Sequence, residues 1–126
     1  MGKAWDAAHP EKWREYRQRW NKSERGKASH RRWKERHPVQ AAAIALRNNM
    51  KRRGLFLSKE EAMVLVVQRS QGACAICGKL APLHVDHKNQ RVRGLLCPAC
   101  NRGLGCFDDS SRLLRQAAKY VEEEEV

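Results

Sequence analysis

Two Cys-x-x-Cys pairs constrain this chain more than any other feature. They are Cys74/Cys77 and Cys97/Cys100, and 19 residues separate them. Four thiolates at this spacing are what a closed tetrahedral zinc site requires. A zinc ion with four cysteine ligands has no open position for water, so we expect it to clamp the ends of the intervening segment rather than to do chemistry.

The 126 residues suffice for one modest domain, or for a small domain with an arm. The longest apolar runs have six residues, at 41–46 and 62–67, so nothing spans a bilayer, and no secretory leader pattern opens the chain. We therefore expect an intracellular protein with no membrane partner. In that compartment, paired cysteines bind metal more often than they form disulfides.

The net charge of +12 is placed very unevenly. Residues 1–57 have 16 Lys and Arg against 5 Asp and Glu, whereas residues 58–126 have 10 against 9. A polyanion is the natural partner of such an arm, DNA ahead of an anionic membrane surface. We predict two domains: a basic, Trp-rich, helical DNA-binding arm at 1–57, and a zinc-bound domain at 58–126.

Tryptophan and basic residues alternate along the first 37 residues. Trp13, Tyr16 and Trp20 recur at helical spacing, and we expect Gly26 to interrupt this helix. The rings either pack the arm against the rest of the protein or a second subunit, or stack on bases while Lys and Arg neutralise phosphates. A Trp-x-x-x-His-Pro pattern also occurs twice, and its prolines suit the first position of a helix. Its copies are Trp5/His9/Pro10 and Trp33/His37/Pro38.

Three further helices are predicted. The first spans 38–53, the second follows a Ser58/Glu61 capping box and ends at Gly72, and the last is capped by Asp108 or Asp109. Each has an apolar side that we expect to be packed. In the 38–53 helix this side is Ala42, Ile44, Ala45 and Met50. In the helix that ends at Gly72 it is Met63, Val66, Val67 and Ser70. In the last helix it is Leu113, Leu114, Ala117, Ala118 and Val121.

The segment between the cysteine pairs has strand character. Residues 83–87 and 91–96 read as strands around a turn at 88–90, and Pro98 begins a helix. Strand, strand and helix with zinc at their base form a ββα unit. The predicted fold class is therefore α+β and mostly helical, a zinc-stapled ββα-metal core with a basic helical arm.

Three polar residues of this unit suit phosphodiester hydrolysis. Asp86 and Asn101 offer hard oxygen ligands to Mg²⁺ or Mn²⁺, and the imidazole of His87 can take a proton from water near neutrality. Neighbouring strand residues face opposite ways, so Asp86 and His87 converge only if the strand is irregular there. The residues thus predict a catalytic metal site in a small nuclease.

Several other side chains are candidates for lesser roles. Six arginines are candidate phosphate contacts, His84 is expected at the surface, and Cys106 is expected to be a small buried apolar residue. The arginines are Arg91, Arg93 and Arg102 beside the candidate site, and Arg47, Arg52 and Arg53 near the end of the 38–53 helix.

The motifs C-A-I-C-G (74–78), V-D-H (85–87) and R-V-R-G-L-L-C-P-A-C-N-R-G-L-G (91–105) resemble the phage recombination endonuclease VII family. That family belongs to the His-Me finger nucleases, which are HNH-like and have a ββα-metal core. The resemblance covers roughly residues 55–121. It implies that the four cysteines hold zinc, that Asp86 and Asn101 hold the catalytic metal, and that His87 is the general base. It also implies Holliday-junction resolution, in which a homodimer cuts two strands, and a location in the cytoplasm of a bacterial host if the chain is phage-encoded.

One departure from the family weakens part of this inference. The family usually has a longer turn after Asp-His, often with a second acidic residue, a second histidine and a glycine, whereas this chain has only Lys88, Asn89 and Gln90. Any role of that extra histidine is missing here or passes to Asn89 or His84. Two alternative functions stay open: an HNH-type nicking or homing endonuclease on duplex DNA, and a non-catalytic zinc-finger DNA-binding protein.

Overall fold

The computed structural model describes residues 7–80 and 82–124, so Trp5 lies outside the described residues. Within this range the chain forms six helices and one two-stranded sheet, as the predicted α+β, mostly helical class requires. Two compact units are present, residues 1–41 and residues 42–126. No helix in the described range is long and apolar enough to cross a membrane.

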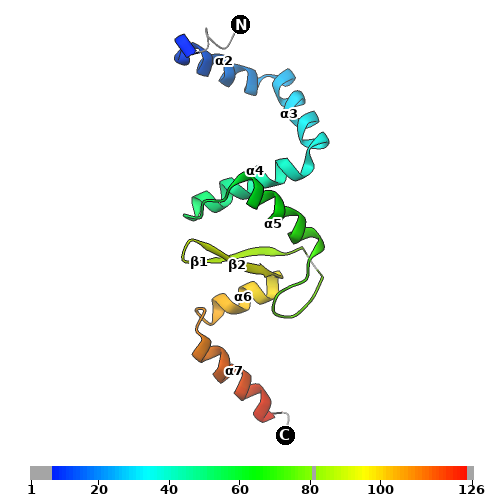
Figure 1. Cartoon of the computed structure of the whole chain (residues 1–126), viewed down its shortest axis with the longest axis vertical. Helices are drawn as coiled ribbons and strands as arrows, with labels where there is room; N and C mark the ends of the chain where they lie inside the picture. Colours follow the sequence, from blue (N-terminus) through cyan, green and yellow to red (C-terminus); the bar gives the residue numbers. More distant parts are fainter. Residues whose placement is uncertain (1–6, 81, 125–126) are drawn as a thin grey trace. The chain divides into compact units, whose positions relative to one another are not determined.

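The first unit contains α2 (Pro10–Lys22) and α3 (Glu24–Arg36), shown in Figure 1. The break between them falls at Ser23, whose side chain accepts a hydrogen bond from the Gly26 N–H and caps α3. The prediction that Gly26 interrupts the helix is therefore wrong. Gly26 is instead buried inside α3, where a Cβ atom would lie 1.9 Å from the carbonyl oxygen of Trp20.

The Trp-x-x-x-His-Pro repeat marks helix boundaries. Pro10 begins α2 and Pro38 begins α4 (Pro38–Arg52), as predicted. The preceding histidines have nearly the same backbone angles, with φ −134° and ψ 60° at His9 and φ −130° and ψ 59° at His37. His37 also stacks on Trp33 at 5.3 Å between ring centroids. A structural role in ending one helix and starting the next accounts for this second copy.

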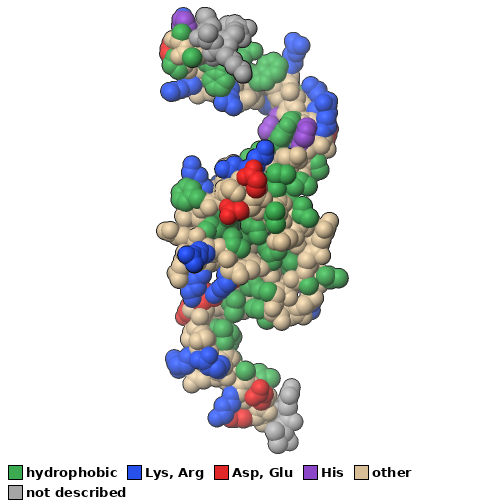
Figure 2. Space-filling model, in the orientation of Figure 1, with side chains coloured by type: hydrophobic (Ala, Val, Ile, Leu, Met, Phe, Trp, Pro, Cys, Tyr) green, Lys and Arg blue, Asp and Glu red, His purple; other side chains and the backbone are tan. Residues whose placement is uncertain are grey.

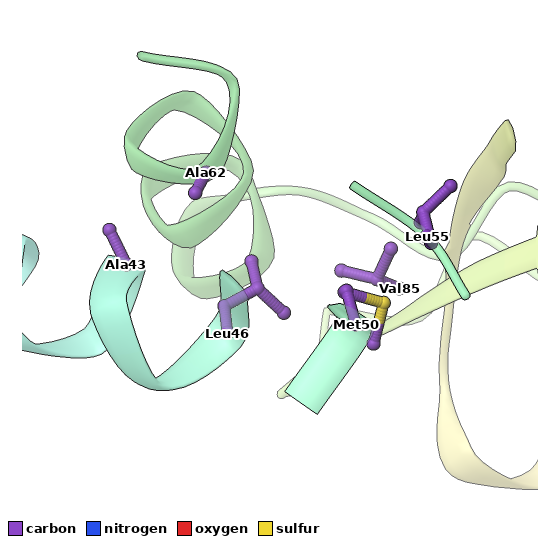
Figure 3. Close-up of a cluster of buried hydrophobic side chains, with 6 residues drawn as sticks. All are labelled: Ala43, Leu46, Met50, Leu55, Ala62 and Val85. Carbon is purple, nitrogen blue, oxygen red and sulfur yellow. The ribbon is translucent and has the colours of Figure 1, made fainter. Parts of the chain in front are cut away.

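The second unit has its main core between α4, α5 (Lys59–Gln71) and the sheet, as Figure 3 shows. The buried face of α4 is Ala43, Leu46 and Met50, whereas Ile44 is 47% exposed and Ala45 is also exposed. The prediction of the packed side of α4 is thus correct at Met50 and wrong at Ile44 and Ala45, which lie on the exposed side. The core residues are Ala43, Leu46, Met50, Leu55, Ala62 and Val85.

The capping box of α5 is present, with Ser58 and Glu61 each accepting a backbone hydrogen bond from the other. On its predicted packed face, Met63 and Val66 are half-buried, but Val67 and Ser70 are exposed and Ala62 is the buried residue. The helix turns its small residue toward α4, which permits close approach of the two helices.

The last helix, α7 (Ser111–Glu124), is capped by Ser110, whose hydroxyl accepts from the Leu113 N–H. Asp108 and Asp109 precede the cap with φ of 52° and 53°, so the prediction that one of them caps the helix is wrong. Only some residues of its predicted apolar stripe are half-buried. Leu113, Leu114 and Ala117 are half-buried, and Ala118 and Val121 are exposed.

The sheet is the antiparallel hairpin of β1 (His84–Lys88) and β2 (Arg91–Leu96). Asn89 and Gln90 both have positive φ, the backbone of a tight two-residue hairpin turn. One face of the hairpin packs on the α4–α5 core through Val85. Leu96 of β2, together with Leu83 just before β1, packs toward α6 (Pro98–Cys106), and Figure 1 shows the hairpin between the α4–α5 layer and α6.

Candidate zinc centre and active site

The four paired cysteines form one cluster at the open end of the hairpin. Their Sγ atoms all lie within 4.8 Å of one another, and those of Cys77 and Cys97 are 3.7 Å apart. A tetrahedral site with Zn–S bonds of about 2.3 Å separates its sulfur atoms by about 3.8 Å, so the cluster fits zinc. Cys97 also caps α6, because its Sγ accepts a hydrogen bond from the Cys100 N–H.

The thiols of this cluster already differ in acidity. A backbone N–H of Cys77 and then one of Cys97 lower the pKa of Cys74 to about 6, and the N–H of Cys100 lowers the pKa of Cys97. Hydrogen bonding with Cys97 and then Cys77 raises the pKa of Cys100 to about 12. Crowded thiolates repel one another without a cation among them, and a bound divalent metal reverses that penalty.

The hairpin is irregular at the candidate catalytic pair. Asp86 pairs with Gly94 and His87 pairs with Val92, which leaves Arg93 as an extra residue of β2. Such a bulge breaks the alternation of side chains and increases the local twist. The extra residue lies on β2, so the cross-strand pairing is irregular at the Asp86–His87 step, and the convergence of these two side chains stays a prediction.

The bulge brings Arg93 onto the carboxylate of Asp86. Arg93 Nε donates to Asp86 Oδ2 at 2.5 Å, and a terminal nitrogen of Arg93 donates to Asp109 Oδ1 at 2.7 Å. The Asp86 side chain is only 11% exposed, and this ion pair places a cation next to its nearly buried carboxylate. Asp86 and then Asp109 raise the pKa of Arg93, and Arg93 lowers the pKa of Asp109.

The three predicted catalytic residues lie on contacting elements. Asp86 and His87 are on β1, Asn101 is in α6, and α6 packs against both strands. His87 and Asn101 are half-buried, and no hydrogen bond joins any two of the three side chains in the part of the chain that the structure describes. Asp86 supplies a buried carboxylate and Asn101 a carboxamide oxygen, a donor set that suits a hard cation such as Mg²⁺.

The candidate phosphate-binding arginines differ in their surroundings. Arg93 is neutralised by two carboxylates, and Arg47 donates to the carbonyl oxygen of Leu57 at 3.0 Å. The side chains of the other four are exposed and form no hydrogen bond or ion pair with a described residue. These are Arg52, Arg53, Arg91 and Arg102.

Two residues of this region depart from expectation. Cys106 is exposed, so the prediction that it is a buried apolar residue is wrong, because the last turn of α6 leaves it facing solvent. Asp109 was expected only as a helix cap, and its contact with Arg93 depends on a left-handed turn that no short motif signals. His84 is exposed, as predicted.

The arm presents its basic and aromatic side chains outward. Within α2 no residue is buried, Tyr16 is 55% exposed and Trp20 is 40% exposed. The guanidinium of Arg17 lies over the Trp13 ring at 4.7 Å. Figure 2 shows Lys and Arg side chains along α2 and α3 with few acidic ones among them.

Comparison with known proteins gives one match. The model of the recombination endonuclease VII family matches residues 47–123, more than half of the chain. The matched range contains the four cysteines, Asp86, His87 and Asn101, and leaves out α2 and α3. Neither a curated protein nor a solved structure is similar enough to the chain to be matched.

Proposed function

Because the chain belongs to the recombination endonuclease VII family, we propose that it is a metal-dependent endonuclease that hydrolyses phosphodiester bonds in branched DNA such as Holliday junctions. The observation that carries the proposal is the family match over a hairpin and helix that hold an Asp-His pair and an asparagine beside a four-cysteine cluster. A carboxylate, an imidazole and a carboxamide are the groups that such a hydrolysis needs.

Each residue has a distinct role in this proposal. Asp86 and Asn101 would hold Mg²⁺ or Mn²⁺, which when bound polarises the phosphate and stabilises the departing 3′-oxygen. His87 removes a proton from the attacking water. The four cysteines with zinc keep the hairpin and α6 in place.

Arg93 and Asp109 hold the Asp86 carboxylate in place. The guanidinium of Arg93 fixes one oxygen of Asp86, and Asp109 fixes Arg93 in turn. Asp86 therefore keeps its second oxygen for a cation. We propose that Arg93 orients this carboxylate rather than contacting a phosphate directly.

The partner in this proposal is DNA, bound by the exposed arm and by arginines near the site. Paired cuts across a junction need two active sites, so the active species is proposed to be a homodimer that works inside the cell. Deleting residues 1–37 should weaken DNA binding and flatten its salt dependence, because fewer phosphates are neutralised. An unchanged salt slope would remove the arm from the contact surface.

The test compares substrates and one variant. Zinc-loaded protein with Mg²⁺ is incubated with a four-way junction and with a linear duplex of the same sequence. His87→Ala should lower the cleavage rate by about 10²- to 10⁴-fold, and Tyr120→Ala, at a 70% exposed position of α7, should leave it unchanged. Size-exclusion chromatography with light scattering gives the oligomeric state.

The outcomes separate the candidate functions. Cutting of the junction alone supports resolution, whereas equal cutting of both substrates supports a nicking or homing-type nuclease. If no divalent metal allows cutting, the remaining function is that of a non-catalytic zinc protein that binds DNA. Full activity of His87→Ala would contradict the assigned general base.

A further inference from the structure

A cavity of about 250 Å³ lies along β1, next to the candidate site. Its apolar wall is formed by Leu46, Met50 and Val85, three residues of the main core. Because these side chains are fixed by core packing, the cavity belongs to the folded scaffold of the second unit. It is smaller than the roughly 300–1,000 Å³ typical of small-molecule sites.

The polar lining of the cavity is basic and comes from four elements. It consists of two arginines, one histidine and two asparagines, and it includes no acidic residue. The members are Asn49 from α4, Arg53 from the turn directly after α4, Arg69 from α5, His84 from β1 and Asn101 from α6.

The two guanidinium groups have no partner among the described residues. Neither Arg53 nor Arg69 forms an ion pair or a side-chain hydrogen bond there, and Arg69 is half-buried. Arg93 of β2, by contrast, has two carboxylate partners. A half-buried cation without a counter-ion is costly, and an anion entering the cavity would remove that cost.

We infer that this cavity binds a phosphate of the DNA backbone close to the one that is cut. Arginine presents a planar set of donors that matches phosphate oxygens in pairs, and the asparagine amides and the His84 imidazole add further donors. The small volume suits one backbone phosphate with part of its sugar. The inference rests on the proposed function and names a further contact of that same site.

Asn101 connects the cavity to the catalytic residues. Its carboxamide has one acceptor oxygen and two N–H donors, so the oxygen can serve a cation while the N–H group serves a phosphate. A strand held in the cavity is thereby positioned relative to Asp86 on the neighbouring part of β1. Arg53 and Arg69 act in this view as substrate-positioning residues.

The first experiment measures binding without cutting. Full-length, zinc-loaded His87→Ala protein is titrated with a fluorescent four-way junction in Ca²⁺ over a series of salt concentrations. Adding both Arg53→Gln and Arg69→Gln should reduce the slope of log affinity against log salt by about 1, the share of one phosphate, and either change alone should reduce it by less. Arg69→Lys, which keeps the charge, should retain the slope.

The control is Arg115→Gln, which removes the same charge from an exposed position of α7. Its slope should stay that of the parent protein. Unchanged slopes in the cavity variants would overturn the inference, and so would an equal loss with Arg115→Gln, because the effect would then be one of net charge. Zinc content and circular dichroism verify that each variant is folded.

The second experiment locates the phosphate. Single methylphosphonates, which are neutral, are placed one at a time along the strand in the same binding assay. One position should weaken binding by the parent and have no further effect on the Arg53→Gln/Arg69→Gln protein. Equal weakening of both proteins at every position would overturn the inference. Because these assays need no cleavage, they can succeed even if the wild-type protein does not cut, which would refute only the proposed function.

Discussion

The two compact units differ in what holds them. In residues 1–41, α2 buries no residue and α3 buries only Gly26, so these helices rest on local capping and on short-range pairs such as Lys27–Glu24. Residues 42–126 bury two apolar clusters and gather four thiols. Residues 1–41 therefore depend on local contacts, whereas residues 42–126 depend on long-range contacts.

The largest expected effect is loss of zinc. Structural zinc sites in small domains contribute apparent free energies of about 10–16 kcal/mol, so chelation or Cys97→Ser should unfold the hairpin and α6. The amide resonances of β1 and β2 should collapse while those of α2 and α3 persist. A Cys97→Ser protein that keeps its hairpin resonances without zinc would break the comparison.

Core truncation is the next largest effect. Leu46 is 5% exposed, and Leu46→Ala should lower the free energy of unfolding of the second unit by about 2–5 kcal/mol. Tyr16→Ala in the arm should change stability by less than about 0.5 kcal/mol, because the ring is already 55% exposed. Urea denaturation followed by hairpin resonances gives both values, and equal effects would contradict the assignment of the core.

Two glycines sharpen the comparison further. Gly26→Ala places its Cβ 1.9 Å from the Trp20 carbonyl oxygen, so the junction of α2 and α3 must shift at a cost of about 1–3 kcal/mol. Gly103→Ala in α6 meets nothing within 4 Å and should stabilise that helix by about 0.5–1 kcal/mol. Helicity measured by circular dichroism should fall in the first variant and not in the second. A gain with Gly26→Ala would show that helix propensity alone governs the arm.

The smallest effect concerns ion pairs. Asp109→Asn should lower the melting temperature by a few degrees at most, and Glu24→Gln in the arm by less, since the Glu24–Lys27 pair is more exposed. Because Arg93 lowers the pKa of Asp109, this stabilisation is present above the ordinary pKa of an aspartate and disappears as pH falls through the lowered value. The Asp109→Asn difference should thus be constant from about pH 6 to about pH 9, and a marked change within that range would contradict it.

Local chemistry made much of this fold predictable. Pro10, Pro38 and Pro98 begin helices, and the capping box starts α5, because these signals act within one turn of the chain. The break at Ser23 was missed because a side-chain cap decided it rather than glycine flexibility. The buried phase of α4 was also missed, since a run of alanines gives little contrast between faces.

In the candidate site, too, local spacing could be predicted from the sequence and contacts between distant elements could not. Cysteine spacing was enough to predict that the four thiols form one cluster, because four thiols at that spacing have few other uses. The contact of Arg93 with Asp86 and Asp109 depends on a bulge and a left-handed turn, which no periodic pattern encodes. The Arg53 and Arg69 cavity unites four separate elements, so only packing reveals it.

Because Arg93 is an extra residue in β2, the register of the hairpin can be tested separately from the ion pair at Asp86. Pairing resumes on both sides of Arg93, with Gly94 opposite Asp86 and Val92 opposite His87. A chain shortened by that single position would therefore keep every cross-strand partner in an unbroken ladder. The insertion adds no cross-strand pair to the ladder, and it places a guanidinium on Asp86. Deletion of Arg93 would give a hairpin of the same register in which the Asp86 carboxylate has lost its cationic partner.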